Sequence, residues 1–166
     1  MKRCLLIIIW SLSIVVLLSG CLLLEGSKPV NHTFLQERKN VAKVEICTRT
    51  DDCYPIGTIV PITSLTTQEI DSFWTEVPAL AAYTILPGET DRLGDLLFRI
   101  SYVDGTQELL GYEEQCVIHA DGSLGGYRGY AFRENELTQL FSKYADPEML
   151  AKNSGYFSHY WSANND

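Results

Sequence analysis

Alternating side chains over residues 96–103, followed at once by Asp104-Gly105, constrain the fold of this sequence more than any other feature. Strict alternation predicts a strand with one buried face, formed here by Leu96, Phe98, Ile100 and Tyr102. Asp-Gly between two apolar runs is typical of a two-residue turn that joins antiparallel strands. The chain is therefore expected to contain an antiparallel sheet with a face that other elements must cover.

Further strands are predicted on both sides of this hairpin. Apolar or alternating runs occupy residues 41–46, 58–63, 106–110, 115–119 and 126–132. Pro61 donates no backbone hydrogen bond, so the run over 58–63 is expected either to be an edge strand or to end at this proline. Asp121-Gly122 provides a second turn between strands.

Two main helices are predicted, one before the hairpins and one after them. Thr66-Thr67-Gln68-Glu69 is a capping box with Thr66 at the N-cap, and the following apolar residues have helical spacing. A second amphipathic helix covers residues 134–144, and Asp146-Pro147 starts a short third one.

The order of these elements predicts an α+β fold. Antiparallel hairpins with helices before and after them favour a curved antiparallel sheet of about five to six strands, with the two main helices packed on one face. The expected sheet–helix core consists of aromatic side chains: Phe73, Trp74, Phe98, Phe141 and Tyr144.

The N-terminus combines a charged start, an apolar run and a cysteine. Lys2-Arg3 precede an apolar stretch over residues 5–18, and Leu18-Ser19-Gly20-Cys21 follows. This arrangement resembles the signal peptide and lipobox of bacterial lipoproteins. The resemblance implies that residues 1–20 are removed, that Cys21 becomes the first residue, and that its thiol carries diacylglycerol. No named domain family is recognised beyond this leader.

The resemblance implies a location at the cell membrane or outer membrane, with the protein facing the periplasm or the exterior. Two alternatives stay open. The apolar run continues through Leu24, so it reaches roughly the 20 residues that span a bilayer and fits an uncleaved signal-anchor. An ordinary cleaved leader would release a secreted protein.

The rest of the chain divides into three expected parts. Residues 21–40 mix Gly, Ser, Pro, Asn and charges, which predicts a flexible membrane tether with His32 in solvent. Residues 41–155 form a single globular domain. Residues 156–166 form an aromatic C-terminal tail, which either folds back onto the domain or presents an apolar patch.

The charge is acidic. The 166 residues carry a formal net charge of −8, and without Lys2 and Arg3 the remainder has 11 basic and 21 acidic side chains, a net −10. Nucleic-acid binding needs a basic face, so it is not expected. The expected partners are the membrane, through the lipid anchor, and another envelope protein.

Three cysteines remain beyond Cys21. Cys47 and Cys53 bracket a short loop between two predicted strands, and a disulfide between them is expected in an oxidising compartment. The alternatives are two unpaired thiols, or Cys116 in place of one partner. Cys116 is otherwise expected to be a small buried apolar residue. The spacing matches no metal site, so neither a metal nor a cofactor is expected.

No catalytic motif is recognised. Cys116 and His119 lie three apart on a predicted strand, so they point to opposite faces. Binding residues are expected in two aromatic stretches, namely Tyr127, Arg128 and Tyr130 in "GGYRGYAF" and Tyr160 and Trp161 near the C-terminus. The first stretch can stack a sugar or a peptide, or it is a strand with glycines at closely packed positions.

These features favour a non-catalytic binding or interaction module of the cell envelope. A small envelope hydrolase acting on cell-wall or lipid substrates is one alternative, and it would need a cleft with convergent polar residues. An assembly factor for an envelope complex, with the C-terminal aromatic residues as its contact, is the other.

Overall fold

Two antiparallel sheets organise this computed structural model, which describes residues 29–30, 32–50, 57–80, 82–84, 95–112, 115–128, 130–155, 157–159 and 161. The large open sheet has six strands in the order β3-β2-β5-β6-β7-β8. Its strands are β2 (Val41–Arg49), β3 (Ile59–Ser64), β5 (Leu96–Tyr102), β6 (Gln107–Gly111), β7 (Gln115–Ile118) and β8 (Leu124–Arg128). The small sheet, in the order β1-β4-β9, joins β1 (Pro29–Val30), β4 (Ala82–Thr84) and β9 (Tyr130–Phe132).

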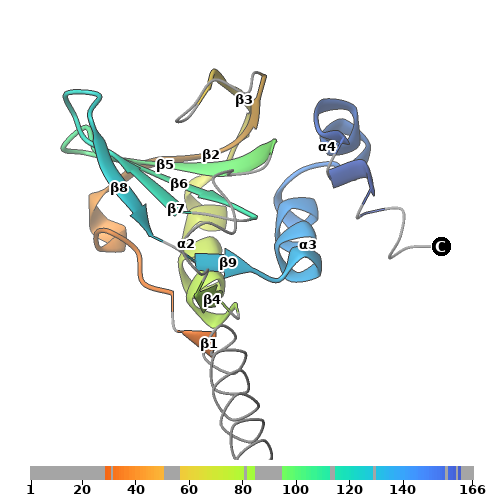
Figure 1. Cartoon of the computed structure of the whole chain (residues 1–166), viewed down its shortest axis with the longest axis horizontal. Coiled ribbons are helices and arrows are strands. Elements are labelled where there is room, and N and C mark those ends of the chain that lie inside the picture. Colours follow the sequence, from red (N-terminus) through yellow and green to blue (C-terminus); the bar gives the residue numbers. More distant parts are fainter. Residues whose placement is uncertain are drawn as a thin grey trace, which may run out of the picture.

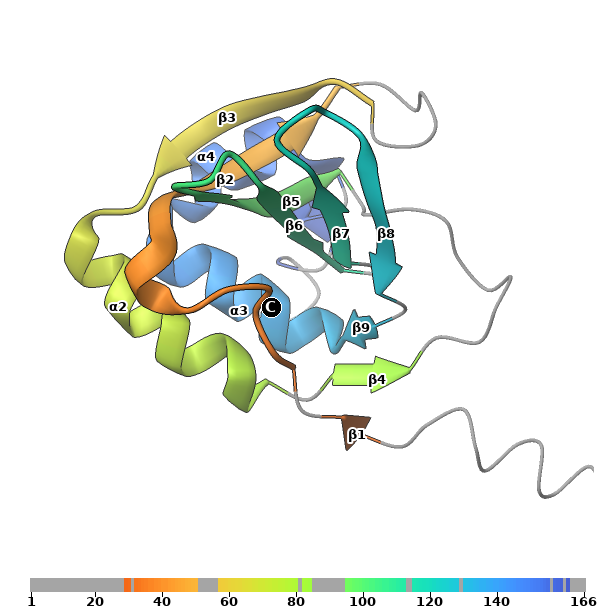
Figure 2. The same cartoon turned by 90° about the vertical axis from the view of Figure 1, so that its left-hand side faces the viewer.

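The helices cover one face of the large sheet, and the fold is α+β as predicted. Helices α2 (Thr67–Glu76) and α3 (Glu134–Tyr144) lie side by side beneath the sheet (Figure 2). Helix α4 (Pro147–Asn153) follows α3 at one end of the sheet (Figure 1), where Thr48 Oγ1 donates to the Asn153 carbonyl at 2.8 Å. Two short 3₁₀ turns are η1 (Arg38–Asn40) and η2 (Val77–Ala79).

The main core lies between the large sheet and α2 and α3. The apolar residues of the alternating run over 96–102 are fully or almost fully buried on this side. The Phe98 ring stacks on Phe141 of α3 at a centroid distance of 4.3 Å and lies 4.8 Å from Phe73 of α2. This confirms the predicted aromatic core, with Trp74 partly buried at its margin.

A second, smaller apolar cluster lies on the opposite face of the sheet. Cys47, Leu97, Leu109 and Cys116 are all fully buried there. Cys116 is thus the buried hydrophobe that its strand position predicts. Strands β5 and β6 separate β2 from β7, which puts Cys47 and Cys116 about 14 Å apart at the usual strand spacing. A Cys47–Cys116 disulfide is excluded at this separation.

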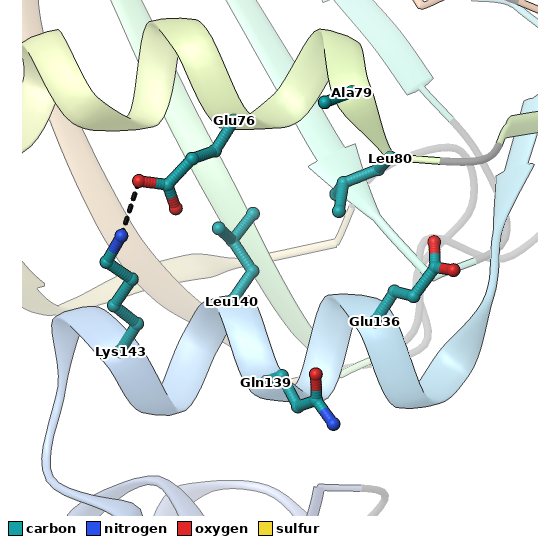
Figure 3. Close-up of a pocket in the computed structure, with 7 residues that line it drawn as sticks. All are labelled: Glu76, Ala79, Leu80, Glu136, Gln139, Leu140 and Lys143. Carbon is teal, nitrogen blue, oxygen red and sulfur yellow. Dashed lines mark hydrogen bonds and ion pairs between the residues drawn. The ribbon is translucent and has the colours of Figure 1, made fainter.

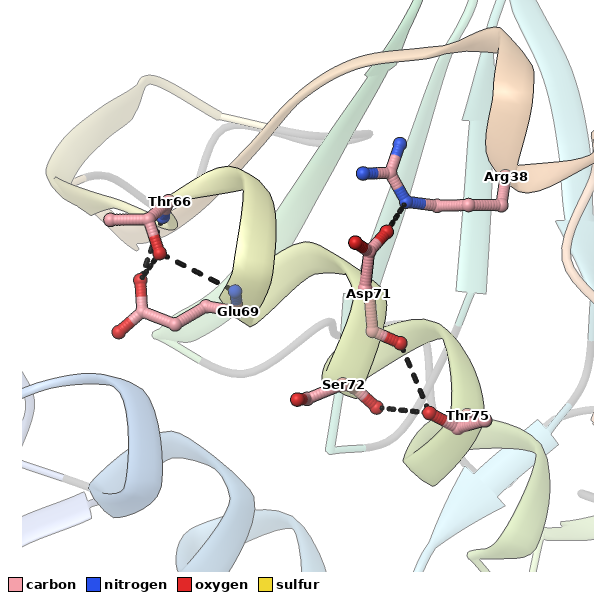
Figure 4. Close-up of polar contacts among 6 residues, drawn as sticks. All are labelled: Arg38, Thr66, Glu69, Asp71, Ser72 and Thr75. Carbon is pink, nitrogen blue, oxygen red and sulfur yellow. Dashed lines mark hydrogen bonds and ion pairs between the residues drawn. The ribbon is translucent and has the colours of Figure 1, made fainter.

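Helix α2 begins where the capping box predicts. The Glu69 backbone N–H donates to Thr66 Oγ1 at 3.4 Å, and the Thr66 backbone N–H donates to Glu69 Oε2 at 2.7 Å (Figure 4). The backbone N–H and the hydroxyl of Thr66 both donate to the Glu69 carboxylate and hold its pKa below the ordinary value. Pro78 follows in η2, where the α-helical hydrogen-bond pattern stops.

The predicted turns are present, and one predicted strand is divided. Gly105 and Gly122 have φ of 85° and 82°, which glycine adopts readily at the turns of both hairpins. The run over 126–132, expected as one strand, forms the end of β8 in the large sheet and β9 in the small one. Strands β1 and β4 were not predicted, because two or three residues are too short for a periodic pattern.

Candidate functional site

Residues 32–40 form a strap that packs on the domain, so their prediction as flexible tether is wrong. The strap runs alongside α2 from β1 to β2 (Figures 1 and 2). His32, expected in solvent, is 2% exposed, and Phe34 stacks on Trp74 of α2 with a centroid distance of 3.6 Å. Residues 32–40 show no periodic pattern of apolar residues, and their composition therefore suggested a tether. The aromatic residues that anchor the strap do not form such a pattern.

The strap meets the sheet at a buried polar cluster made of His32, Tyr102, Glu108 and Gln115. The side chains of Glu108 and Gln115 are fully buried. His32 Nε2 lies 3.2 Å from Gln115 Oε1 and 3.9 Å from Glu108 Oε1. Glu108 Oε2 accepts hydrogen bonds from the Tyr102 hydroxyl and, at 2.9 Å, from the backbone N–H of Leu35.

The register of the sheet explains why the cluster faces the helices. Glu108 lies opposite Ile100 of β5 and Val117 of β7, so its side chain shares their side of the sheet. Burial, together with the negative charge of Glu108, raises the pKa of Tyr102 above its ordinary value. Tyr102 therefore keeps its proton and remains a donor to Glu108.

A carboxylate beside a histidine is an arrangement that can serve general acid–base catalysis. Here His32 and Glu108 lie in the interior, and the rings of Phe34 and Phe132 flank His32 at 5.1 and 5.4 Å. No substrate can reach the pair while the strap is in place. In this state the cluster holds the strap on the sheet.

The strap has a second attachment, on α2. Arg38 Nε donates to Asp71 Oδ1 at 2.7 Å (Figure 4). Close by, Gln36 Nε2 donates to Asp104 Oδ2, also at 2.7 Å. Both contacts are exposed, so each contributes little free energy compared with the buried cluster.

A groove between α2 and α3 is the candidate binding surface. It encloses about 350 Å³ and is lined by Glu76, Ala79, Leu80, Glu136, Gln139, Leu140 and Lys143. The α3 residues recur at intervals of three and four, which places them on one face of that helix. Figure 3 shows Leu80 and Leu140 pointing into the space between the two helices.

The groove has an apolar floor and a charge at each end. Lys143 Nζ donates to Glu76 Oε1 at one end (Figure 3). At the other end Glu136 Oε1 lies 3.8 Å from Arg133 Nη1. The side chains of Glu76, Glu136 and Lys143 remain 30% exposed or more, so an incoming ligand can reach them. This arrangement suits an amphipathic ligand.

A charged cluster of Lys43, Glu45 and Arg99 lies on the face of the large sheet that points away from the helices. Arg99 donates to Glu45 Oε2 through Nε at 3.0 Å and Nη2 at 2.8 Å, and Lys43 Nζ donates to Glu45 Oε1 at 2.6 Å. Burial opposes ionisation of Glu45, but its bonds to Lys43 and Arg99 outweigh burial and hold its pKa below the ordinary value. The cluster stabilises β2 against β5.

The thiol of Cys47 is in an environment that makes it unreactive. The structure holds Cys47 as a fully buried thiol, and burial raises its pKa to about 11. Its expected partner Cys53 lies outside the described residues, so the bridge stays a prediction. Cys116 is fully buried and His119 is exposed, and the absence of a nucleophile–base pair between them stays a prediction.

The structure describes few of the side chains in the predicted aromatic binding stretches. Tyr127 and Arg128 belong to β8 and Tyr130 to β9, and only their backbone is described. A side chain at Gly125 would come within 2.8 Å of the His119 ring and 2.9 Å of Val117, so close packing explains this glycine of β8. Binding by Tyr127, Arg128 and Tyr130 stays a prediction.

The C-terminal aromatic residues fold back onto the domain in the part that is described. Phe157 is fully buried, and Trp161 is partly buried and stacks on it at 5.7 Å. The core therefore extends past residue 155, the expected domain boundary. Tyr160 lies outside the described residues.

The proposed lipid site at Cys21 also lies outside the described residues. Within them, none of the helices is long and apolar enough to cross a bilayer. The same part of the chain contains no group of three side chains suited to hold a metal ion.

Comparisons with family models, curated proteins and solved structures yield no match for this chain.

Sequence reasoning missed the buried polar cluster. Glu108 was visible as the one acid at an inward position of the run over 106–110, and Gln115 begins the next strand. A polar residue in phase with buried neighbours signals a specific interior partner. That partner, His32, lies 76 residues from Glu108, a separation that no local pattern bridges.

Proposed function

We propose that this protein is a lipid-anchored module of the cell envelope that binds another envelope protein and catalyses no reaction of its own. The lipobox-like sequence ending at Cys21 supports the anchor. The observation that carries the binding role is the open groove between α2 and α3, with its apolar floor and exposed end charges. The buried pair His32–Glu108 is inaccessible as it stands, which argues against a hydrolytic centre there.

The short distance between anchor and domain defines where binding would occur. Pro29 is already paired with Tyr83 of β4, eight residues after Cys21. Eight extended residues reach about 28 Å. A protein attached through Cys21 would therefore stay close to the membrane surface, and its partner would be a membrane protein or another anchored protein.

Site-specific photo-crosslinking in intact cells tests the binding role. A photoreactive residue replaces Gln139 at the groove or, as the control, Val103, which is 70% exposed at the β5–β6 turn. We expect a discrete adduct from position 139 that is absent from position 103. Identical adducts from both positions, or none from position 139, would contradict the proposal.

A second substitution connects the adduct to the groove. Leu80→Asp places a charge on the apolar floor and should lower the yield at position 139 at least fivefold. Val60→Asp, on an exposed position of edge strand β3, should leave the yield unchanged. Equal effects of the two substitutions would show that the adduct does not depend on the groove.

A further inference from the structure

We infer that the groove between α2 and α3 receives a basic amphipathic helix of the partner protein, with the apolar side of that helix packed over Leu80 and Leu140. This inference rests on the proposed binding role and adds the chemistry of the bound segment. The occupant is a helix of another protein whose apolar side faces the groove floor and whose flanks carry Lys or Arg.

The walls of the groove favour a helix over an extended segment. All seven lining residues come from α3 or from residues 76–80, which end α2 and form the turn η2. An extended peptide binds by adding to the edge of a sheet, where backbone groups await a partner. Over an apolar helical surface, the backbone groups of such a peptide would lose water without gaining hydrogen bonds. A helix satisfies its own backbone and can bury its apolar side on Leu80 and Leu140 (Figure 3).

The length of the groove defines the length of the bound segment. On α3 the lining extends from Glu136 to Lys143, which is seven residues, or about 10 Å along the helix axis. The lining residues of α3 follow spacings of three and four, which form the surface ridge that packs into the grooves of a neighbouring helix. The matching segment is therefore about two turns long, with apolar residues at positions i, i+3 or i+4, and i+7.

The charges of the groove favour a basic segment. The lining contains two carboxylates, Glu76 and Glu136, and one ammonium group, Lys143, which gives a net charge of −1. The carboxylates lie at opposite ends of the groove, and their side chains are 32% and 30% exposed. Each carboxylate has two oxygens that can accept several donors, so a partner cation can bind Glu76 beside Lys143 or Glu136 beside Arg133. The chain's net charge of −8 also attracts a cationic segment before contact.

The same charges disfavour the acyl chain of an anionic lipid. The apolar floor alone would suit such a chain, but its head group would lie close to a carboxylate at either end of the groove. A lipid attached to a probe in the groove is therefore an outcome that would overturn the inference.

Mapping the attachment sites of the adduct from position 139 tests the occupant. The photoreactive residue replaces Gln139 in the full chain in intact cells, and the adduct is digested and sequenced by mass spectrometry. We expect attachment at partner residues three or four apart, in a segment that contains Lys or Arg, because a helix presents one face to the probe. Attachment at alternate residues, in an acidic segment or to a lipid would overturn the inference and leave the groove as a binding surface. Absence of any adduct would contradict the binding role itself, and the inference with it.

A charge reversal tests the electrostatic part of the inference. Glu136→Lys should lower the adduct yield about fivefold, because it repels the partner's cations. Glu37→Lys makes the same change of charge on the strap, at a side chain that is 73% exposed, and should alter the yield less than about twofold. Equal losses from the two substitutions would contradict a specific contact in the groove.

A compensating change in the partner separates lost pairing from misfolding. Each Lys or Arg of the mapped segment is replaced in turn by Glu and combined with Glu136→Lys. We expect one combination to restore most of the yield, which a misfolded variant could not do. Failure of every combination to restore the yield would contradict a helix held by opposite charges.

Discussion

Removal of the Phe34 side chain tests whether residues 32–40 belong to the folded domain. Phe34 is half-buried and stacks on Trp74 at 3.6 Å with an interplanar angle of 14°. Truncating a fully buried phenylalanine costs about 3–5 kcal/mol, so half of that, about 2 kcal/mol, is expected for Phe34→Ala. For a domain of this size, 1 kcal/mol changes Tm by about 3 °C, which gives a decrease of about 6 °C.

Thermal unfolding of the full chain in detergent, followed by circular dichroism, measures this decrease. Circular dichroism is preferred because the substitution also alters the surroundings of Trp74 and therefore its fluorescence. Val103→Ala, at a side chain that is 70% exposed, should change Tm by less than about 1 °C. If Phe34→Ala behaves like Val103→Ala, the strap contributes nothing to stability and residues 32–40 act as the flexible tether that their composition suggests.

Three further outcomes follow from the described contacts. Thr66→Ala removes one half of the capping box and should lower the free energy of unfolding by about 1 kcal/mol in urea titrations, whereas Thr75→Ala within the same helix should not; equal effects would contradict the cap. Glu45→Gln should cost about 2 kcal/mol at pH 7. Folding lowers the pKa of Glu45, so this stabilisation is present above the ordinary glutamate pKa. It disappears as the pH falls through the pKa of Glu45 in the folded protein. An equal cost of Glu45→Gln at pH 7 and pH 3 would refute this contribution. Cys47, with its pKa raised to about 11, should resist iodoacetamide at pH 8 in the native protein, and rapid labelling there would contradict its burial. After denaturation without reductant, labelling of Cys47 indicates a thiol. Absence of labelling after denaturation indicates the predicted bridge to Cys53.

Much of the fold could be predicted from local sequence, because its causes are local. The alternation from Leu96 to Tyr102 identifies the buried face of β5, and Asp104-Gly105 identifies the turn after it. The side chains of Thr66 and Glu69 start α2 through bonds within a single helical turn. Such features need no distant partner, which is why the prediction and the structure agree there.

The parts that escaped prediction depend on contacts between distant residues. Phe34 and His32 acquire their roles only when α2, β6 and β7 surround them. The groove likewise exists because α2 and α3 are brought together by the sheet, so Leu80 and Leu140 become neighbours although 60 residues separate them. Periodicity and composition do not contain this information.

The intact mass of the protein purified from the membranes of a bacterium that processes lipoproteins tests the central claim most directly. The account predicts a chain that begins at Cys21 and carries the added mass of diacylglycerol. It also predicts that Cys21→Ser abolishes this modification. A membrane-bound chain that starts at Met1 with no added lipid, or a soluble chain cut elsewhere, would contradict the account.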